Sequence, residues 1–174
     1  MFRRHVLVAT FAAIVALPPT VEAAPKADDD PARIPRVRPN EPAIAALIEQ
    51  GVLQSKTFKS LVAAIDRTDG IVYVHEGRCW HGVRACLMLS ITVAGDYRIL
   101  HILVKRDGEE RRLIASIGHE LRHALEVLSE PAIRSNADAY HFFARTAPTD
   151  KEIFETRAAV LAGMDVYAEL GSHK

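Results

Sequence analysis

Residues 117–126 read Ile-Gly-His-Glu-Leu-Arg-His-Ala-Leu-Glu and contain the pattern H-E-x-x-H, with His119 and His123 four residues apart. On an α-helix, residues at this spacing lie about 40° from each other around the axis and one turn apart along it. Two imidazoles placed in this way can bind one metal ion, and zinc accepts imidazole nitrogens readily. Glu120 lies about 100° further round the helix, where it can contact a water on the metal without being a ligand. The stretch therefore predicts a helix that carries part of a metal site.

Apolar residues around the pattern recur at spacings of three and four, as expected for a helix with one buried face. They are Leu113, Ile114, Ile117, Leu121, Ala124, Leu125 and Leu128. Their stripe is centred opposite His119, so both histidines face away from the core and toward a cleft. A solvated histidine-rich face, or a chance match to a five-residue pattern, is the alternative interpretation. The amphipathic context favours the metal site.

The composition is that of an ordinary globular protein, because 49% of the 174 residues are hydrophobic and 25% are charged. A chain of this kind has room for one domain with a core. The formal net charge is zero, and no run of Lys and Arg is present. Nucleic acid is therefore not expected as a partner, because phosphate binding needs clustered basic residues.

The N-terminus has the features of an export signal. Arg3 and Arg4 precede an apolar run of 12 residues at 6–17, and small residues allow cleavage after Ala23. The run is shorter than the about 20 residues that span a bilayer, so an uncleaved membrane anchor is the less favoured alternative.

This interpretation divides the chain into a signal peptide at 1–23, a Pro-rich linker at 24–40 with nothing to bury, and one domain at 41–174. The mature chain is then expected to be periplasmic or secreted and to have no membrane span. The oligomeric state does not follow from the sequence.

Hydrophobic periodicity predicts an α+β fold, with a small sheet of about three strands packed against the H-E-x-x-H helix and helices before and after it. Helices are expected at residues 41–50, 56–67, 109–129, 135–145 and 150–170, and strands at 71–75, 86–93 and 97–105. The last strand is apolar on both faces, which predicts an inner position or cover by helices. A turn is expected at Gly95-Asp96.

Capping residues set the expected helix ends. Asn40 and Gly51 are expected to begin and end the first helix. Ser135 with Asp138, and Thr149 with Glu152, match the pattern of a capping box and are expected to open the last two helices.

Cys79 and Cys86 flank a short loop between the first two predicted strands. In an exported protein, two such cysteines are most simply explained by a disulfide. A second metal site made by both cysteines and His81 is the alternative. Trp80 and His81 could line a cleft, although aromatic residues in loops more often only pack.

A catalytic zinc needs three protein ligands, so the two histidines require a third. The downstream candidates are Glu126, Glu130, Asp138, His141, Glu152 and Glu155. Glu126 would approach from the same side as both histidines, which suits a carboxylate that holds one histidine better than it suits a ligand. Capping already explains Asp138 and Glu152.

Glu155 is the preferred third ligand. It is expected on the final helix, 32 residues after His123, which is far enough for the chain to return across the cleft. The small residues Ala158, Ala159 and Ala162 would let that helix pack closely at a metal. The alternative is an exposed glutamate in a first helical turn, where the helix dipole favours it.

An H-E-x-x-H helix followed by a glutamate on a later helix resembles the gluzincin clan of zinc metallopeptidases. Gly118–Val127 and Phe154–Ala159 also resemble short exported bacterial zincin-like proteins. The resemblance implies that His119, His123 and Glu155 bind Zn²⁺ and that Glu120 is the general base. The chain departs from the large gluzincins because it lacks a separate C-terminal domain with substrate subsites.

The resemblance implies hydrolysis of an amide bond in a peptide or protein substrate by a zinc-activated water. The tetrahedral oxyanion needs a further donor, for which Tyr140 and His141 are preferred over Arg157 and Tyr167 because they lie between the two motifs. The alternative function is a non-catalytic zinc-binding protein of the envelope with a binding or assembly role. Glu120 favours the enzyme, because a purely structural site does not use an acid beside its first ligand.

Overall fold

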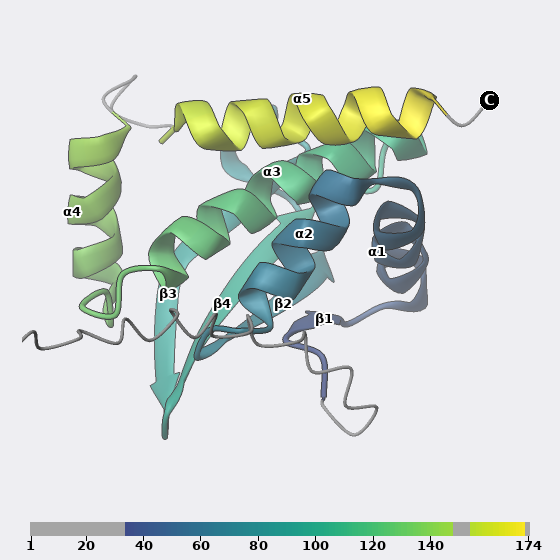
Figure 1. Cartoon of the computed structure of the whole chain (residues 1–174). Helices are drawn as coiled ribbons and strands as arrows, with labels where there is room; N and C mark the ends of the chain where they lie inside the picture. The colour runs from purple at the N-terminus through teal and green to yellow at the C-terminus, as the bar shows by residue number, and fades with distance from the viewer. Residues whose placement is uncertain (1–33, 148–153, 173–174) are drawn as a thin grey trace, which may run out of the picture. The chain divides into compact units, whose positions relative to one another are not determined.

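The computed structural model describes residues 34–147 and 154–172 (Figure 1). The elements in chain order are β1 (Val37–Pro39), α1 (Pro42–Gln54), α2 (Lys56–Ile65), β2 (Gly70–Glu76), the short 3₁₀ helix η1 (Trp80–Gly82), β3 (Ala85–Ala94), β4 (Tyr97–Val104), α3 (Glu110–Leu128), α4 (Asn136–Thr146) and α5 (Arg157–Gly171). Within the described residues, five α-helices and one four-stranded sheet form an α+β fold. The predicted fold class is confirmed.

The sheet is mixed and has the strand order β1-β2-β4-β3. β1 pairs with β2 and β2 with β4 in parallel, whereas β3 runs antiparallel to β4 and forms an edge. β4 therefore has a neighbour on each side, as its apolar residues on both faces predicted. Gly95, with a positive φ of 59°, lies in the predicted turn between β3 and β4.

Strand β1 lies inside the segment that was predicted to be a linker with nothing to bury, and that prediction was wrong at this end. Val37 is buried and pairs with Val72 of β2. A strand of three residues that ends in a proline is too short to show a period in the sequence. Their strand conformation depends on β2, which is remote in sequence, and no local pattern reports it.

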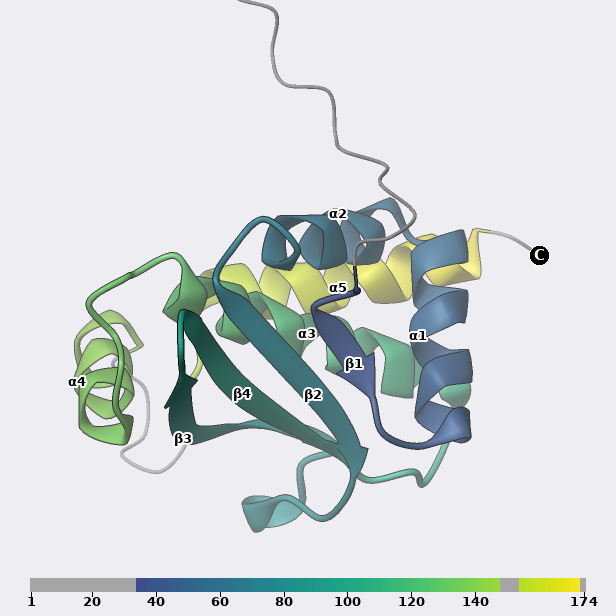
Figure 2. The same cartoon turned by 90° about the horizontal axis from the view of Figure 1, so that it is seen from below.

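The helices α1, α2, α3 and α5 lie on one side of the sheet, and α5 crosses α3 on the side away from the strands (Figures 1 and 2). The core between α3 and the sheet consists of fully buried aliphatic residues, namely Val72, Val74, Leu100, Ile102, Ile114, Ile117 and Leu121. The apolar stripe of the H-E-x-x-H helix is thus buried, and its opposite face is left for the site.

Two glycines let α3 and α5 approach closely. A Cβ added at Gly118 would lie 2.9 Å from Cγ2 of Val166, and a Cβ at Gly163 would lie 3.2 Å from Cβ of His119. Such distances are shorter than ordinary carbon contacts of about 3.5–4 Å. The backbone of α5 can therefore pack directly beside the first histidine.

The structure corrects three predicted helix ends. Gly51 lies inside α1, where a Cβ would be 2.9 Å from the ring of Phe58, so this glycine serves the packing of α2. The residue before α1 is Glu41, which makes no side-chain cap, and the Asn40 amide contacts Nδ1 of His75 at 2.8 Å instead. The third correction is the start of α5, at Arg157 rather than near residue 150. The predicted capping box at Thr149 and Glu152 lies outside the described residues.

Arg98 of β4 fixes the end of α3 against the sheet. Its side chain is 1% exposed and forms an ion pair with Asp69, with 2.6 Å between Nη2 and Oδ1. It also donates to the backbone carbonyls of Val127, Leu128, Glu130 and Ile133 at 2.7–3.1 Å. One guanidinium therefore satisfies carbonyls at the C-terminus of α3 that have no partner within the helix.

Within residues 34–147 and 154–172, no helix combines the length and the hydropathy needed to cross a bilayer. The predicted signal peptide at 1–23 lies outside the described residues. Cys79 and Cys86 form a disulfide, which is typical of proteins in oxidising compartments. The disulfide uses both sulfurs and therefore excludes the alternative metal site with His81.

Candidate metal centre

Helix α3 places His119 and His123 side by side, with their ring centroids 4.8 Å apart. The His123 side chain is 6% exposed and the His119 side chain is 18% exposed. His123 packs edge-to-face against Phe143 of α4 at 5.3 Å between centroids. The predicted helix and the shared face of the two histidines are confirmed.

Glu155 joins the two histidines, although from a different element than predicted. It precedes α5, and Thr156 is the N-cap residue of that helix. Oε2 of Glu155 lies 3.4 Å from Nε2 of His119, and one ligand atom from each of the three residues lies within 4.8 Å of the others. In a tetrahedral site with bonds of about 2 Å, donor atoms lie about 3.3 Å apart. The three side chains can therefore hold one metal ion after small shifts.

The hydrogen bonds of His123 leave one nitrogen for a metal. Its Nδ1 lies 3.0 Å from Oε2 of Glu126, whereas its buried Nε2 has no hydrogen-bond partner. Buried polar atoms without a partner are rare in native proteins, and an ion is one explanation for them. Because the Glu126 carboxylate accepts a hydrogen, Nδ1 carries the proton and Nε2 presents its lone pair. The prediction that Glu126 holds a histidine is confirmed.

The carboxylates change the proton affinities of the site. Burial lowers the pKa of His119, but the hydrogen bond to Glu155 and the charge of Glu120 outweigh this effect and raise the pKa above its ordinary value. The same hydrogen bond lowers the pKa of the Glu155 carboxyl against the effect of burial. A group of acidic side chains around two imidazoles favours positive charge at this place, whether it comes from a proton or from a metal ion.

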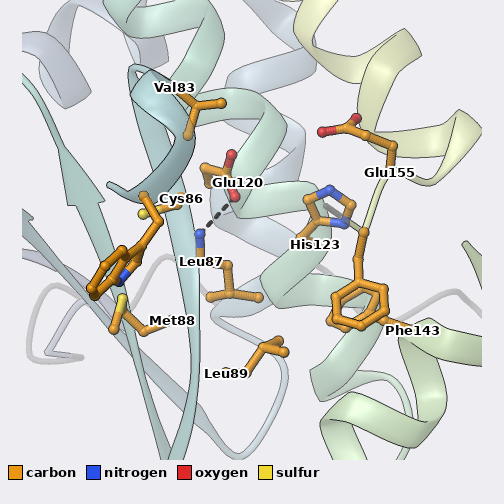
Figure 3. Close-up of a pocket in the computed structure, with 11 residues that line it drawn as sticks. Val83, Cys86, Leu87, Met88, Leu89, Glu120, His123, Phe143 and Glu155 are labelled. Carbon is orange, nitrogen blue, oxygen red and sulfur yellow. Dashed lines mark hydrogen bonds between the residues drawn. The ribbon is translucent and has the colours of Figure 1, made fainter. Parts of the chain in front are cut away.

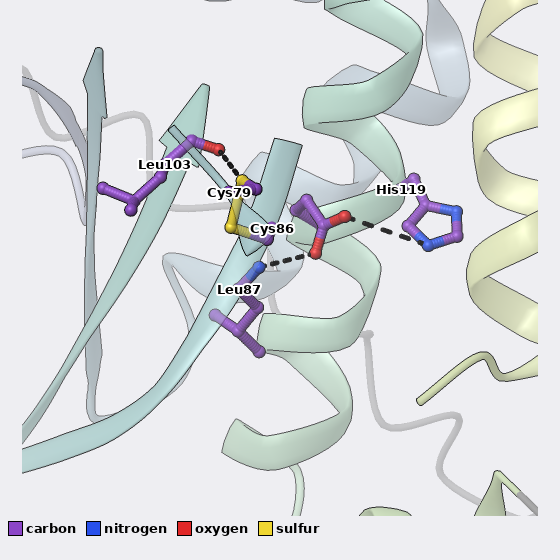
Figure 4. Close-up of a disulfide and its surroundings, with 6 residues drawn as sticks. Cys79, Cys86, Leu87, Leu103 and His119 are labelled. Atoms are coloured by element: carbon purple, nitrogen blue, oxygen red, sulfur yellow. Dashed lines mark hydrogen bonds and ion pairs between the residues drawn. A yellow bond between two sulfur atoms is a disulfide. The ribbon is translucent and has the colours of Figure 1, made fainter. Parts of the chain in front are cut away.

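Glu120 is buried between α3 and the edge strand. Its Oε2 accepts a hydrogen bond from the backbone N–H of Leu87 at 2.7 Å, and its Oε1 lies 4.0 Å from Nε2 of His119 (Figures 3 and 4). Burial raises the pKa of the Glu120 carboxyl, despite the opposing effects of both histidines. One oxygen is thus held by β3 while the other lies near the metal-binding group.

A cavity of about 310 Å³ adjoins the site (Figure 3). Its lining is mostly apolar and consists of Trp80, Val83, Cys86, Leu87, Met88, Leu89, Glu120, His123, Phe143, Phe154 and Glu155. A larger depression of about 990 Å³ shares Val83, Glu120 and Glu155 with it and extends along α5. The metal-binding group therefore lies where two hollows meet.

The Cys79–Cys86 disulfide (Figure 4) closes a loop that forms a wall of this cavity (Figure 3). Trp80 and Val83 from this loop line the cavity, and Trp80 is 81% exposed. The disulfide therefore fixes a short segment beside the site.

Tyr140 and His141 are placed differently from the prediction. Both are exposed on α4, and neither is among the residues that line the two hollows. Tyr140 packs edge-to-face on Phe154 at 5.4 Å between centroids. The face of α4 that reaches the site carries Phe143 instead, so the geometry gives no support to an oxyanion role for Tyr140 or His141.

Two residues of the site were missed in the sequence. The backbone N–H of Leu87 has no signal in a side-chain pattern. Thr156 could have been recognised as an N-cap before the Ala-rich segment that starts at Ala158, since threonine is a favoured residue at that position. No protein-family model, curated protein or solved structure matches this chain. The gluzincin resemblance stays a prediction.

Proposed function

We propose that this protein is a zinc-dependent hydrolase that cleaves peptide bonds. The observation that carries the proposal is the buried Nε2 of His123, which has no hydrogen-bond partner, in a residue that offers a ligand atom within 4.8 Å of ligand atoms from His119 and Glu155. Two imidazoles and one carboxylate are a donor set that zinc uses in catalytic sites. A bound zinc ion would supply Lewis acidity, which makes water more acidic and polarises a carbonyl group.

Glu120 is the proposed general base. Leu87 N–H holds Oε2, so Oε1 is the oxygen that takes a proton from the attacking water and returns it to the leaving amine. The burial that raises the pKa of Glu120 brings the carboxyl closer to the pH at which it must both accept and release a proton. Glu120 is not needed to complete the three-residue metal-binding group.

The proposed substrate is a peptide in extended conformation. Leu87, Met88 and Leu89 of the edge strand β3 line the cavity, so a peptide can place an apolar side chain in the hollow. The N–H groups of Leu87 and Ile91 already donate to Glu120 and Asn136, so the apolar hollow rather than strand pairing would hold the peptide. The volume of about 310 Å³ suits one or two side chains.

Metal analysis of the purified protein tests the site. We expect about one zinc per chain in the wild type and almost none after His119→Ala and His123→Ala are combined. Glu155→Ala should lower the affinity for zinc, because one of three ligands is lost. If Glu155→Ala binds zinc with unchanged affinity, Glu155 is not a ligand, and Glu126 becomes the next candidate for the third ligand.

Cleavage of a peptide library tests the chemistry. We expect cleavage that a chelator abolishes and that Glu120→Gln reduces by at least about 100-fold, with zinc content unchanged. Glutamine keeps an oxygen that can accept the Leu87 N–H, so this variant removes the base and retains the contact. If the wild type binds zinc but cleaves no peptide, the non-catalytic zinc-binding function replaces the proposed one.

A further inference from the structure

Glu155 lies between two residues that attach it to different helices. Phe154 stacks on Phe143 of α4 with 5.7 Å between ring centroids. Thr156 is buried, and its hydroxyl donates to Oε1 of Glu126 on α3 at 2.8 Å. The position of Glu155 therefore depends on its two neighbours in sequence, because it is not part of a helix.

The Glu126 carboxylate contacts both sides of the site. Its Oε2 binds the ring of His123 at 3.0 Å, and its Oε1 binds Thr156 at 2.8 Å. Arg122 lies 3.4 Å from the same Oε1. One carboxylate thus links a ligand on α3 to the residue that follows the ligand Glu155.

Thr156 has a second role that must be separated from this contact. Its oxygen accepts a hydrogen bond from the backbone N–H of Ala159 at 3.1 Å and so caps α5. The other end of α5 is attached independently, because Glu169 accepts hydrogen bonds from Ser55, the N-cap residue of α2, and from Thr57 of α2 at 2.6–3.0 Å. Loss of the Thr156 hydroxyl should therefore change the position of Glu155 without releasing the whole helix.

We infer that Thr156 and Glu126 form a positioning pair that fixes the separation between the ligands His123 and Glu155. The inference rests on the proposed function, since it assigns to these two residues the geometry of the same zinc site. Groups that hold metal ligands typically change metal affinity about 10–100-fold when they are removed. The Thr156 hydroxyl should have an effect of this size although it is not itself a ligand.

Three substitutions at one position separate the two roles of Thr156. Thr156→Ser keeps both hydrogen bonds and should bind zinc within about threefold of the wild type. Thr156→Val loses both and should bind about 10–100-fold more weakly. Thr156→Asp keeps an oxygen that caps α5 but cannot donate to Glu126, and it should bind about as weakly as Thr156→Val. The new carboxylate would also repel Glu126 at this distance, so the decisive outcome for Thr156→Asp is binding like the wild type, which would show that the donated hydrogen bond is not needed.

Thr57→Val is the matched control. It removes the same kind of bond, a threonine hydroxyl to a glutamate oxygen at 2.9 Å, from the far end of α5. We expect its zinc affinity to stay within about threefold of the wild type.

Zinc affinity is measured by competition with a chromophoric chelator, and the unfolding midpoint of each metal-free variant is measured in urea. The inference is overturned if Thr156→Asp binds zinc like the wild type, or if Thr57→Val loses as much affinity as Thr156→Val. Neither outcome affects the proposed function, provided that the wild type binds zinc. A wild type that binds no zinc overturns the proposed function and the positioning pair together.

Discussion

Replacement of Arg98 by methionine tests how the metal helix is attached to the sheet. The guanidinium is almost fully buried and donates to Asp69 and to four backbone carbonyls at and beyond the end of α3. Methionine fills a similar space and supplies no donor. The substitution therefore removes all of these hydrogen bonds. The carbonyls of Val127 and Glu130 keep a backbone N–H donor, so the loss falls mainly on those of Leu128 and Ile133.

The expected loss of stability follows from the contacts. Removing one member of a buried ion pair costs about 3–5 kcal/mol, and each buried carbonyl left without a partner costs about 1–3 kcal/mol. Asp69 is 34% exposed and can regain water, which reduces the cost. We therefore expect Arg98→Met to lower the free energy of unfolding by about 4 kcal/mol, a large share of the 5–15 kcal/mol typical of a domain.

Urea unfolding of the two proteins measures this loss. Arg106→Met is the control, because Arg106 forms an ion pair with Glu76 in which both side chains are nearly half exposed. Such exposed pairs contribute about 0–1 kcal/mol. A loss below about 1 kcal/mol in Arg98→Met, or equal losses in both variants, would refute the reasoning.

The remaining predictions concern pH, packing and the disulfide. The hydrogen bond from Arg98 lowers the pKa of Asp69, so the stability that this ion pair contributes is complete above about pH 4 and is lost as the pH falls through the lowered pKa. In urea unfolding between pH 2 and 6, Arg98→Met should therefore lack this loss of stability at low pH. An acid dependence equal to that of the wild type would contradict the assignment. Gly163→Ala should weaken zinc binding about tenfold, because the new methyl group would contact His119 too closely. The free energy of unfolding should change by under about 1 kcal/mol, because alanine favours the helix. Full zinc affinity in chelator competition would show that α5 can shift. Replacing both Cys79 and Cys86 by serine should lower the free energy of unfolding by about 2–3 kcal/mol, as expected for a short closed loop. It should also raise KM for peptides, because the loop that holds Trp80 beside the cavity would no longer be fixed. An unchanged KM would show that this loop does not take part in substrate binding.

The metal helix could be predicted from the sequence because its information is local. Apolar spacing placed Ile117 and Leu121 in the core, and the four-residue spacing placed His119 and His123 together. Glu155 was found by its distance along the chain from His123, although it precedes α5 rather than lying on it.

What the sequence did not predict depends on partners that are remote along the chain. β1 forms only because β2 offers a parallel neighbour, and Gly51 belongs to a helix because Phe58 packs over it. Arg98 looked like one polar residue in an apolar strand, and its role appears only when the end of α3 comes to lie beside it. Tyr140 and His141 were preferred because they lie between the two motifs, but the order of residues does not show which side of α4 faces the site, and both are exposed.

Glu155 and His123 are 32 residues apart in the chain, and one metal ion would bind both. A bound ion is then a cross-link that closes a loop containing all of α4, as a disulfide would, but one that exists only while the ion is present. Because the ion would bind the folded chain and not the unfolded one, its stabilisation grows with the free ion concentration and reaches about 2.7 kcal/mol at 100 times the dissociation constant. The stability of the segment that follows α3 would therefore vary with the concentration of free zinc around the protein. The supply of metal would then control the stability of the folded chain as well as the activity of the site.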